Sequence, residues 1–180
     1  MSKRPPPRFH GIRIYRDPDG VYQLHYPTDW AVFRLSEERD GIMLSPEAEA
    51  QATWFSVWKV KLREAVVAED LPELRAGLDE GLAHLGEGCS LQTSTEAVMG
   101  NLIKCERVHT FREMGMLRKR KQWVVYVDRW QIVLIYQGAS PEEYDYWLAM
   151  ANYSFHTFDI PNELWFAADR DLSGLHRHMG

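Results

Sequence analysis

The sequence has few cysteines, no long apolar run and fewer basic than acidic residues, and each scarcity excludes a class of protein. Two cysteines in 180 residues are too few for the disulfide framework of a small secreted domain. No apolar run approaches the roughly 20 residues of a membrane helix, so we expect no membrane association. With 21 basic and 26 acidic side chains the net charge is −5, which disfavours nucleic-acid binding because phosphate contacts need clustered cations.

The two cysteines are expected to be reduced. A hairpin turn at Gly100-Asn101 would place Cys105 opposite Glu96, several residues out of register with Cys89, which is too far for a disulfide. The basic N-terminus is followed by no apolar stretch of signal-peptide length. We therefore predict a cytoplasmic protein.

Motifs that carry chemistry are absent too. The sequence has no G-x-S-x-G elbow, no phosphate-binding glycine loop and no H-E-x-x-H helix, and its cysteines lack the paired spacing of a zinc site. Cys105 and His109 share one expected strand and could act as nucleophile and base, but beside the apolar Phe111 they are better explained as core residues. We predict no catalytic residue, no metal and no cofactor, so an enzyme is the less favoured class.

The sequence does contain a pair of strongly apolar strand patterns around a turn at Asp128-Arg129. Residues 124–127 and 132–136 are rich in β-branched and aromatic side chains and do not alternate with polar ones, so both faces of these strands should be covered. Shorter or more polar strands are expected at residues 12–15, 21–26, 31–35, 42–44, 52–62, 91–98 and 102–111.

Two helix patterns supply the covering layers. Residues 70–85 carry leucines along one face. Gly77 and Gly81 interrupt that helix, and because glycine costs helix stability we expect a close approach to the sheet to compensate. Residues 140–143, SPEE, open a second helix that should end near residues 152–154. The chain should therefore form an α/β/α sandwich of the α+β class, in which a mostly antiparallel sheet carries a helix on each face.

The chain divides into three parts by composition. Residues 1–11 are basic and proline-rich and are predicted to form a disordered arm. Residues 12–160 are expected to form a single domain, and residues 161–180 a C-terminal tail. Trp165 in that tail is apolar within a charged segment, so we expect it to pack on the domain or to dock on another protein.

The segment Tyr22–Trp30, YQLHYPTDW, resembles the opening strand of the PsbP-like superfamily, which is followed by proline and tryptophan. The order of the long strand 54–62, the leucine helix 71–85 and two hairpins is also similar, as is the closing segment 153–155; the likeness covers about residues 12–160. The superfamily includes the PsbP extrinsic proteins of photosystem II, the Ran-binding nuclear import factors, and bacterial DcrB-like and LpqN-like proteins. The resemblance implies the same sandwich and a mostly non-enzymatic role, and it carries over no catalytic residue.

Two groups of residues are candidate sites. Trp54 and Trp58 lie four apart on one strand and could line a ligand cleft, although core packing under a helix is the simpler explanation. The hairpin from Lys104 to Lys121 contains seven basic and two acidic residues. Its cationic end should project into water, either as a solvated turn or as a docking site for an acidic partner such as residues 64–80 of a second copy. The candidate partner-binding residues are Arg112, Arg118, Lys119, Arg120, Lys121, Trp165 and Phe166.

The composition, the absent motifs and the resemblance together predict a non-enzymatic cytoplasmic binding or accessory protein that recognises a protein partner. A homodimer is one form that this recognition could take. The alternatives are a chaperone that shields apolar segments of secreted effectors and a small enzyme with an aromatic-lined cleft. An exposed apolar groove would favour the chaperone, and a deep pocket with convergent titratable groups would favour the enzyme.

Overall fold

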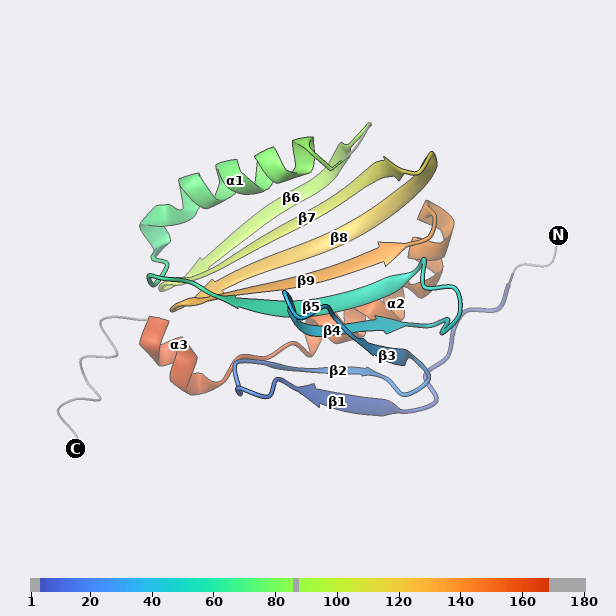
Figure 1. Cartoon of the computed structure of the whole chain (residues 1–180), viewed down its shortest axis with the longest axis horizontal. Coiled ribbons are helices and arrows are strands. Elements are labelled where there is room, and N and C mark those ends of the chain that lie inside the picture. Colours follow the sequence, from blue (N-terminus) through green and yellow to red (C-terminus); the bar gives the residue numbers. More distant parts are fainter. Residues whose placement is uncertain (1–3, 86–87, 169–180) are drawn as a thin grey trace.

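The main element of the fold is a seven-stranded antiparallel sheet (Figure 1). The coordinates are a computed structural model that describes residues 4–85 and 88–168. Across the sheet the strands are β3 (Ala31–Arg34), β4 (Asp40–Ser45), β5 (Trp54–Lys61), β9 (Trp130–Gly138), β8 (Met116–Val127), β7 (Leu102–Glu113) and β6 (Ser90–Met99).

The large sheet is built from its two edges toward the middle. Strands β3, β4 and β5 follow one another inward from one edge. Strand β6 forms the opposite edge, and β7, β8 and β9 follow inward until β9 pairs with β5. The turn predicted at Asp128-Arg129 is confirmed, because Val127 pairs with Trp130 across it. The apolar runs of β8 and β9 are buried on both faces, as their unbroken pattern predicts.

A smaller sheet lies beside the β3 side of the large one (Figure 1) and consists of β1 (Ile12–Arg16) and β2 (Gln23–Pro27). The turn between them ends at Gly20, whose φ of 72° is a left-handed conformation that glycine adopts without steric cost. Gln23 and Asp159 exchange two backbone hydrogen bonds of 2.9 Å. The small sheet is therefore fastened to the segment that follows the last long helix.

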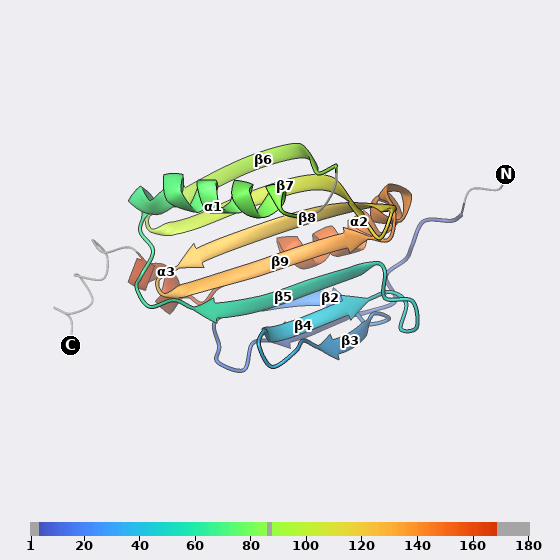
Figure 2. The ribbon, with the colours of Figure 1, turned by 45° about the horizontal axis from the view of Figure 1, so that its top comes forward.

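Helices cover both faces of the large sheet, as expected for an α/β/α sandwich (Figure 2). The described helices are η1 (Ala68–Asp70, a 3-10 turn), α1 (Leu71–Ala83), α2 (Pro141–His156) and α3 (Asn162–Ala168). None of them is long and apolar enough to cross a membrane.

Helix α2 is longer than the sequence predicts. It begins as expected, with the Ser140 hydroxyl accepting a hydrogen bond of 3.2 Å from the backbone N–H of Glu143. It continues to His156 instead of ending near residues 152–154. The extension is explained by Phe155, which is 1% exposed and packs in the core from the last turn of the helix.

The face of the sheet beneath α2 carries the main hydrophobic core. The ring of Phe155 lies 5.0 Å from that of Phe55 on β5 and 4.9 Å from that of Trp123 on β8. Trp30, the tryptophan of the YQLHYPTDW segment, is 3% exposed and meets Trp147 of α2 edge-on at 6.1 Å. This core therefore connects three parts of the molecule, which are the large sheet, helix α2 and the segment that follows β2.

A buried lysine lies at the edge of this core. Lys59 on β5 is 4% exposed. Its Nζ donates a hydrogen bond to Asp17 and lies 2.6 Å from a carboxylate oxygen of Asp40 and 2.9 Å from one of Asp19. Burial disfavours the charged amine, but hydrogen bonds to the three aspartates outweigh it and raise the pKa of Lys59. This cluster ties β5 to the turn between β1 and β2.

Where the structure describes it, in residues 4–11, the N-terminal arm contacts α2, and the predicted disorder of residues 1–11 stays a prediction. The Arg4 guanidinium lies 3.8 Å from the centroid of the Tyr146 ring and pairs with Glu143 at 2.9 Å. The aromatic and acidic side chains on the outer face of α2 supply these contacts. A reading of the arm's own composition cannot foresee them.

Part of the predicted tail of residues 161–180 also packs on the domain. Residues 162–168 form α3, and Trp165 packs against the main core, as expected. The side chain of Phe166 and all residues after Ala168 lie outside the described part of the chain.

Candidate functional site

Helix α1 is packed much less tightly than α2. None of its residues is buried. Leu71, Leu74 and Leu78 are half-buried against a small apolar cluster around Ile103 on β7 and Val124 on β8. Two cavities lie between α1 and the sheet.

The glycines of α1 border open space instead of the sheet. A Cβ atom added at Gly77 or Gly81 would meet no heavy atom within 4 Å, so the predicted close approach of these residues to the sheet is wrong. Each glycine costs about 1 kcal/mol of helix stability relative to alanine, with no packing contact in return. Their effect is to widen the larger cavity, which both of them line.

The larger cavity, here called the tryptophan cavity, has a volume of about 530 Å³. Trp54 and Trp58, the two residues proposed from the sequence as a cleft lining, both line it. The α1 side of the cavity is formed by Leu78, Leu82 and Leu85 together with the two glycines. Its walls are therefore mainly apolar and aromatic.

Strand pairing orders the floor of the tryptophan cavity into two rows that cross β5, β9 and β8. Residues that lie opposite one another in neighbouring strands share a face of the sheet. Arg120, Gln122 and Ser56 therefore point to the same side as the tryptophans, toward α1. The first row is Trp54, Gln137 and Arg120, and the second is Ser56, Ile135 and Gln122.

The lining of the tryptophan cavity is positively charged. Among the described residues it holds two arginines and no acidic side chain. Arg120 donates hydrogen bonds of 3.1 and 2.5 Å to Oε1 of Gln137, and its guanidinium lies 5.6 Å from the Trp54 ring. Burial lowers the pKa of Arg120 to about 10, so the side chain stays charged at neutral pH. Arg39, between β3 and β4, lies 4.9 Å from the Trp58 ring.

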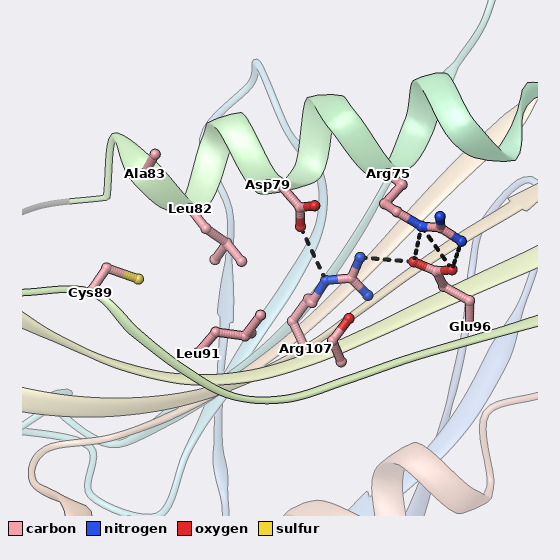
Figure 3. Close-up of a pocket in the computed structure, with 9 residues that line it drawn as sticks. Arg75, Asp79, Leu82, Ala83, Cys89, Leu91, Glu96 and Arg107 are labelled. Atoms are coloured by element: carbon pink, nitrogen blue, oxygen red, sulfur yellow. Dashed lines mark hydrogen bonds and ion pairs between the residues drawn. The ribbon is translucent and has the colours of Figure 1, made fainter.

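The second cavity, here called the ion-pair cavity, has a volume of about 450 Å³ and shares Leu82 with the first. In Figure 3, Arg75 and Asp79 point from α1 toward Arg107 and Glu96 of the sheet. Glu96 accepts hydrogen bonds from Arg75 and from Arg107 at 2.9 Å each, and Arg107 lies 3.6 Å from Asp79.

The charges of the ion-pair cavity satisfy one another. The hydrogen bonds from Arg75, with that from Arg107, lower the pKa of Glu96 to about 2. The network fastens α1 to β6 and β7, and it leaves no unbalanced charge for a ligand. We therefore assign it a structural role and regard the tryptophan cavity as the candidate site.

Cys105 and His109 do not form a catalytic pair. Cys105 lies opposite Glu96, as predicted, and both cysteines are free. Burial raises the pKa of the Cys105 thiol. Burial and the charge of Arg120 lower the pKa of His109 to about 4, and neither of its ring nitrogens has a hydrogen-bond partner in the described part of the chain. Within the same residues no cluster of His, Cys, Asp or Glu could hold a metal ion.

The basic hairpin is less exposed than the sequence predicts. Arg118 is 7% exposed, pairs with Glu113 at 3.2 Å and donates a hydrogen bond to the Ala139 carbonyl. Lys121, on the other face, is 9% exposed and donates a hydrogen bond of 3.0 Å to Oδ1 of Asn152 in α2. The prediction that this strand end is cationic and solvated on both faces is therefore wrong, because neighbouring segments cover each face.

The other candidate partner-binding residues differ in exposure. Lys119 is half-buried and pairs with Asp145 of α2 at 2.9 Å. Arg120 belongs to the tryptophan cavity, and Trp165 packs on the core. Of the five basic residues named from the sequence, Arg112 alone is exposed. A partner-binding role for this group stays a prediction.

The sequence indicates the tryptophans of the cavity but not the polar groups that share it. Sequence pattern alone assigns Arg120 to a solvated hairpin. In the structure, the strand register places Arg120 opposite Gln137 and therefore beneath α1. The signal that could have located the cavity is the pair Gly77 and Gly81. Two glycines at helical spacing inside a leucine-rich helix can mark either close packing or open space beside that helix, and here they mark open space.

No family model matches the chain, and no curated protein matches it in sequence. Solved structures do match its fold. The PsbP protein CyanoP of Synechocystis sp. PCC 6803 has a TM-score of 0.61 at 10% identity, over 89% of this chain and 99% of that one. LpqN of Mycobacterium tuberculosis, a protein involved in cell envelope biogenesis, has a TM-score of 0.58 at 15% identity, over 84% and 91%.

A third structure, of a protein from Bacteroides thetaiotaomicron, has a TM-score of 0.54 at 13% identity. The match covers 82% of this chain and 48% of that one. At these identities the comparisons show the fold alone, and that fold is PsbP-like, as the segment Tyr22–Trp30 and the order of the elements predict.

Proposed function

We propose that this protein is a non-enzymatic binding protein and that the tryptophan cavity is its binding site. The observation that carries the proposal is a cavity of about 530 Å³ with aromatic and leucine walls and a few polar groups on its floor. Cavities of about 300–1,000 Å³ with this composition are typical of small-molecule sites. The PsbP-like fold, shared with PsbP and LpqN, supports an accessory or binding role.

The composition of the lining favours binding over catalysis. The described residues that line the cavity include no histidine, cysteine, lysine, aspartate or glutamate. The Ser56 hydroxyl therefore has no neighbouring base in the lining to activate it as a nucleophile. Arginine, glutamine and tryptophan side chains recognise a ligand without exchanging protons with it at neutral pH.

The size of the cavity disfavours the chaperone alternative. An apolar client segment of about 20 residues would form a helix of about 30 Å. It would need a long exposed apolar groove, whereas the tryptophan cavity has a volume of about 530 Å³ and is roofed by α1.

A neutral apolar dye tests the proposal. N-phenylnaphthylamine becomes fluorescent in apolar surroundings, and we expect it to bind the full-length protein saturably at one site per chain. Trp54→Ala should weaken that binding by roughly 5-fold or more, because it removes an aromatic wall. Tyr146→Ala, which changes an aromatic residue on α2, is the matched control and should bind the dye like the wild type. Absence of saturable binding, or equal binding by Trp54→Ala, would contradict the proposal.

Recognition of a protein partner is a second candidate function, and the tip of the β7–β8 hairpin favours it. Met114 is 95% exposed, Met116 51% and Leu117 41%, and the exposed Arg112 lies beside them in sequence. Adjacent exposed apolar residues on a protein surface often mark a contact surface. A homodimer formed through this tip should be visible by sedimentation equilibrium and should be lost in Met114→Glu. A wild-type protein that stays monomeric at all concentrations would exclude the homodimer.

A further inference from the structure

We infer that the ligand of the tryptophan cavity is a small amphiphilic carboxylate, whose head binds Arg120 and whose apolar body lies between the tryptophans and α1. This inference rests on the function proposed above and adds the chemical class of the ligand. It is drawn from the charge balance of the sheet, the unsatisfied Ser56 hydroxyl on the cavity floor and the shape of the cavity.

Arg120 differs from the buried cations of the same sheet. Every buried lysine and arginine among the described residues has a carboxylate partner. Among the same residues, Arg120, half-buried beneath α1, has only the Gln137 amide and the faces of Trp54 and Phe111. Of the two other half-buried cations in this part of the chain, Lys119 pairs with Asp145 and Lys104 lies over the Trp123 ring. A cation withdrawn from water without an anion is costly, so a bound carboxylate would complete the pattern of the sheet. The paired cations are Lys59 with Asp40 at 2.6 Å, Arg107 with Glu96 at 2.9 Å, Arg118 with Glu113 at 3.2 Å and Lys121 with Glu106 at 3.7 Å.

A second, independent observation is the Ser56 hydroxyl. Ser56 is 2% exposed, lines the cavity, and its Oγ has no hydrogen-bond partner in the described part of the chain. Buried hydroxyls are nearly always hydrogen-bonded. Ser56 and Gln122 occupy the row next to that of Arg120, on the same face of the sheet. A ligand with acceptor oxygens could therefore use donors from both rows.

One negative charge fits the cavity better than two. Arg120 is a single half-buried cation. The other arginine of the lining, Arg39, is exposed, so it attracts anions but holds them weakly. The α1 residues that line the cavity run from Gly77 to Leu82, and Leu85 follows just after the helix, so the cavity borders the C-terminal end of α1, where the helix dipole is negative. A carboxylate suits this balance, and a phosphate with nearly two charges does not.

The rest of the cavity fits an apolar body. Trp54 and Trp58 form one wall and the α1 leucines form the roof. Gly77 and Gly81 leave space in that roof that a side chain would otherwise fill. An acyl chain or a ring attached to the carboxylate would occupy this space and bury apolar surface, which gives affinity in proportion to the area covered.

Three eight-carbon compounds that differ in head-group charge test the inference. Octanoate, octanol and octylammonium are titrated against the dye complex of the full-length protein at neutral pH. We expect octanoate to displace the dye at roughly 10-fold lower concentration than octanol, because a charge-assisted hydrogen bond to Arg120 is available to the acid alone. Octylammonium should be weaker than octanol.

Two variants locate the effect. Arg120→Gln should abolish the preference for octanoate over octanol, whereas Arg13→Gln, an exposed arginine on β1, should keep the preference. Gly81→Leu should weaken binding of the dye itself without lowering the melting temperature, because the leucine side chain would enter the cavity while leucine favours the helix and its Cβ meets open space.

The outcomes separate the two proposals. If the dye binds the cavity but octanol displaces it as well as octanoate does, or if Arg120→Gln keeps the preference for the acid, the carboxylate inference is wrong and the binding function stands. If the dye does not bind the cavity, the proposed function itself fails.

Discussion

The two faces of the seven-stranded sheet are covered in different ways. On one face, α2 contributes Tyr144, Met150 and Phe155 as buried residues to a core that also includes Trp30 and Tyr22. On the other face, α1 buries none of its residues and stands over two cavities. The same sheet therefore has one face that is closely packed and one that is held open.

Different interactions hold the two helices. Aromatic packing holds α2, whereas α1 is fastened by half-buried leucines and by the ion pairs of Arg75, Glu96, Arg107 and Asp79. Elements with few buried apolar contacts open at lower free-energy cost than core elements. We therefore expect the α2 face to supply most of the stability, and the α1 face is the one that we propose for binding.

The largest expected effect is on core packing. Phe155→Ala on α2 should lower the free energy of unfolding by about 3–5 kcal/mol, because it leaves a cavity in a closely packed core. Leu78→Ala on α1 should cost much less, since Leu78 is half-buried and already borders open space. Denaturant unfolding of both variants measures the difference. Equal losses would mean that the two faces contribute alike.

The second prediction compares the ion-pair cluster of Lys59 with that of Arg75. Lys59→Met on the α2 face removes the partner of the buried Asp17 carboxylate and should lower the free energy of unfolding by about 3–5 kcal/mol. Arg75→Met on α1 should lower it much less, because the Arg75 side chain is half exposed and water screens its ion pair. Thermal or denaturant unfolding at neutral pH is the measurement. A costly Arg75→Met would show that ion pairs, and not leucines, are what hold α1.

A third prediction concerns the effect of pH on His109, a fully buried histidine on the α1 face of the sheet. The pKa of His109 is about 4 in the folded protein and about 6.5 in an unfolded chain. Between these values the unfolded state binds more protons, so stability is full above pH 6.5 and falls by up to about 1.4 kcal/mol per pH unit below it.

His109→Gln should reduce the loss of stability between pH 7 and pH 5, a range that lies above the pKa of most carboxylates. His84→Gln, an exposed histidine that follows α1, is the control and should keep the wild-type slope. Unfolding curves measured at a series of pH values give the slopes. An unchanged slope in His109→Gln would show that His109 is not the group that titrates.

Much of the fold could be predicted from local pattern. The turn at Asp128-Arg129, the hairpin that sets Cys105 opposite Glu96 and the Ser140 cap all depend on residues close together in sequence. The covering of both faces of β8 and β9 follows from their apolar runs, which leave no polar face for solvent. Such features are decided by propensity, period and turn chemistry.

The features that could not be predicted depend on contacts between distant segments. The N-terminal arm contacts α2 through Arg4 and Tyr146, which lie more than a hundred residues apart in the chain. Arg118 and Lys121 look solvated in sequence but are covered by segments that follow β9. Of the candidate site, sequence indicates Trp54 and Trp58, while strand register is needed to place Arg120 in the same row as Trp54.

The last and smallest predicted effect concerns glycines on the two faces. Gly77→Ala and Gly81→Ala should each raise the free energy of unfolding by up to about 1 kcal/mol, because alanine favours the helix and a Cβ at either position meets no heavy atom within 4 Å. Gly138→Ala, beneath α2, is the opposing control, since its Cβ would lie 2.4 Å from the Cβ of Tyr144. It should destabilise the protein by about 1–3 kcal/mol through overpacking.

Stabilisation by both α1 substitutions would show that these glycines are retained at a cost to the fold. The dye titration then shows whether these glycines strengthen ligand binding in return for the lost stability. If Gly77→Ala/Gly81→Ala is more stable than the wild type but binds the dye more weakly, the open face of the sheet is kept open for a ligand. If it is more stable and binds equally well, the glycines do not set the width of the site. If it is less stable, α1 lies closer to the sheet than the open space at these positions indicates, and the contrast between the two faces disappears.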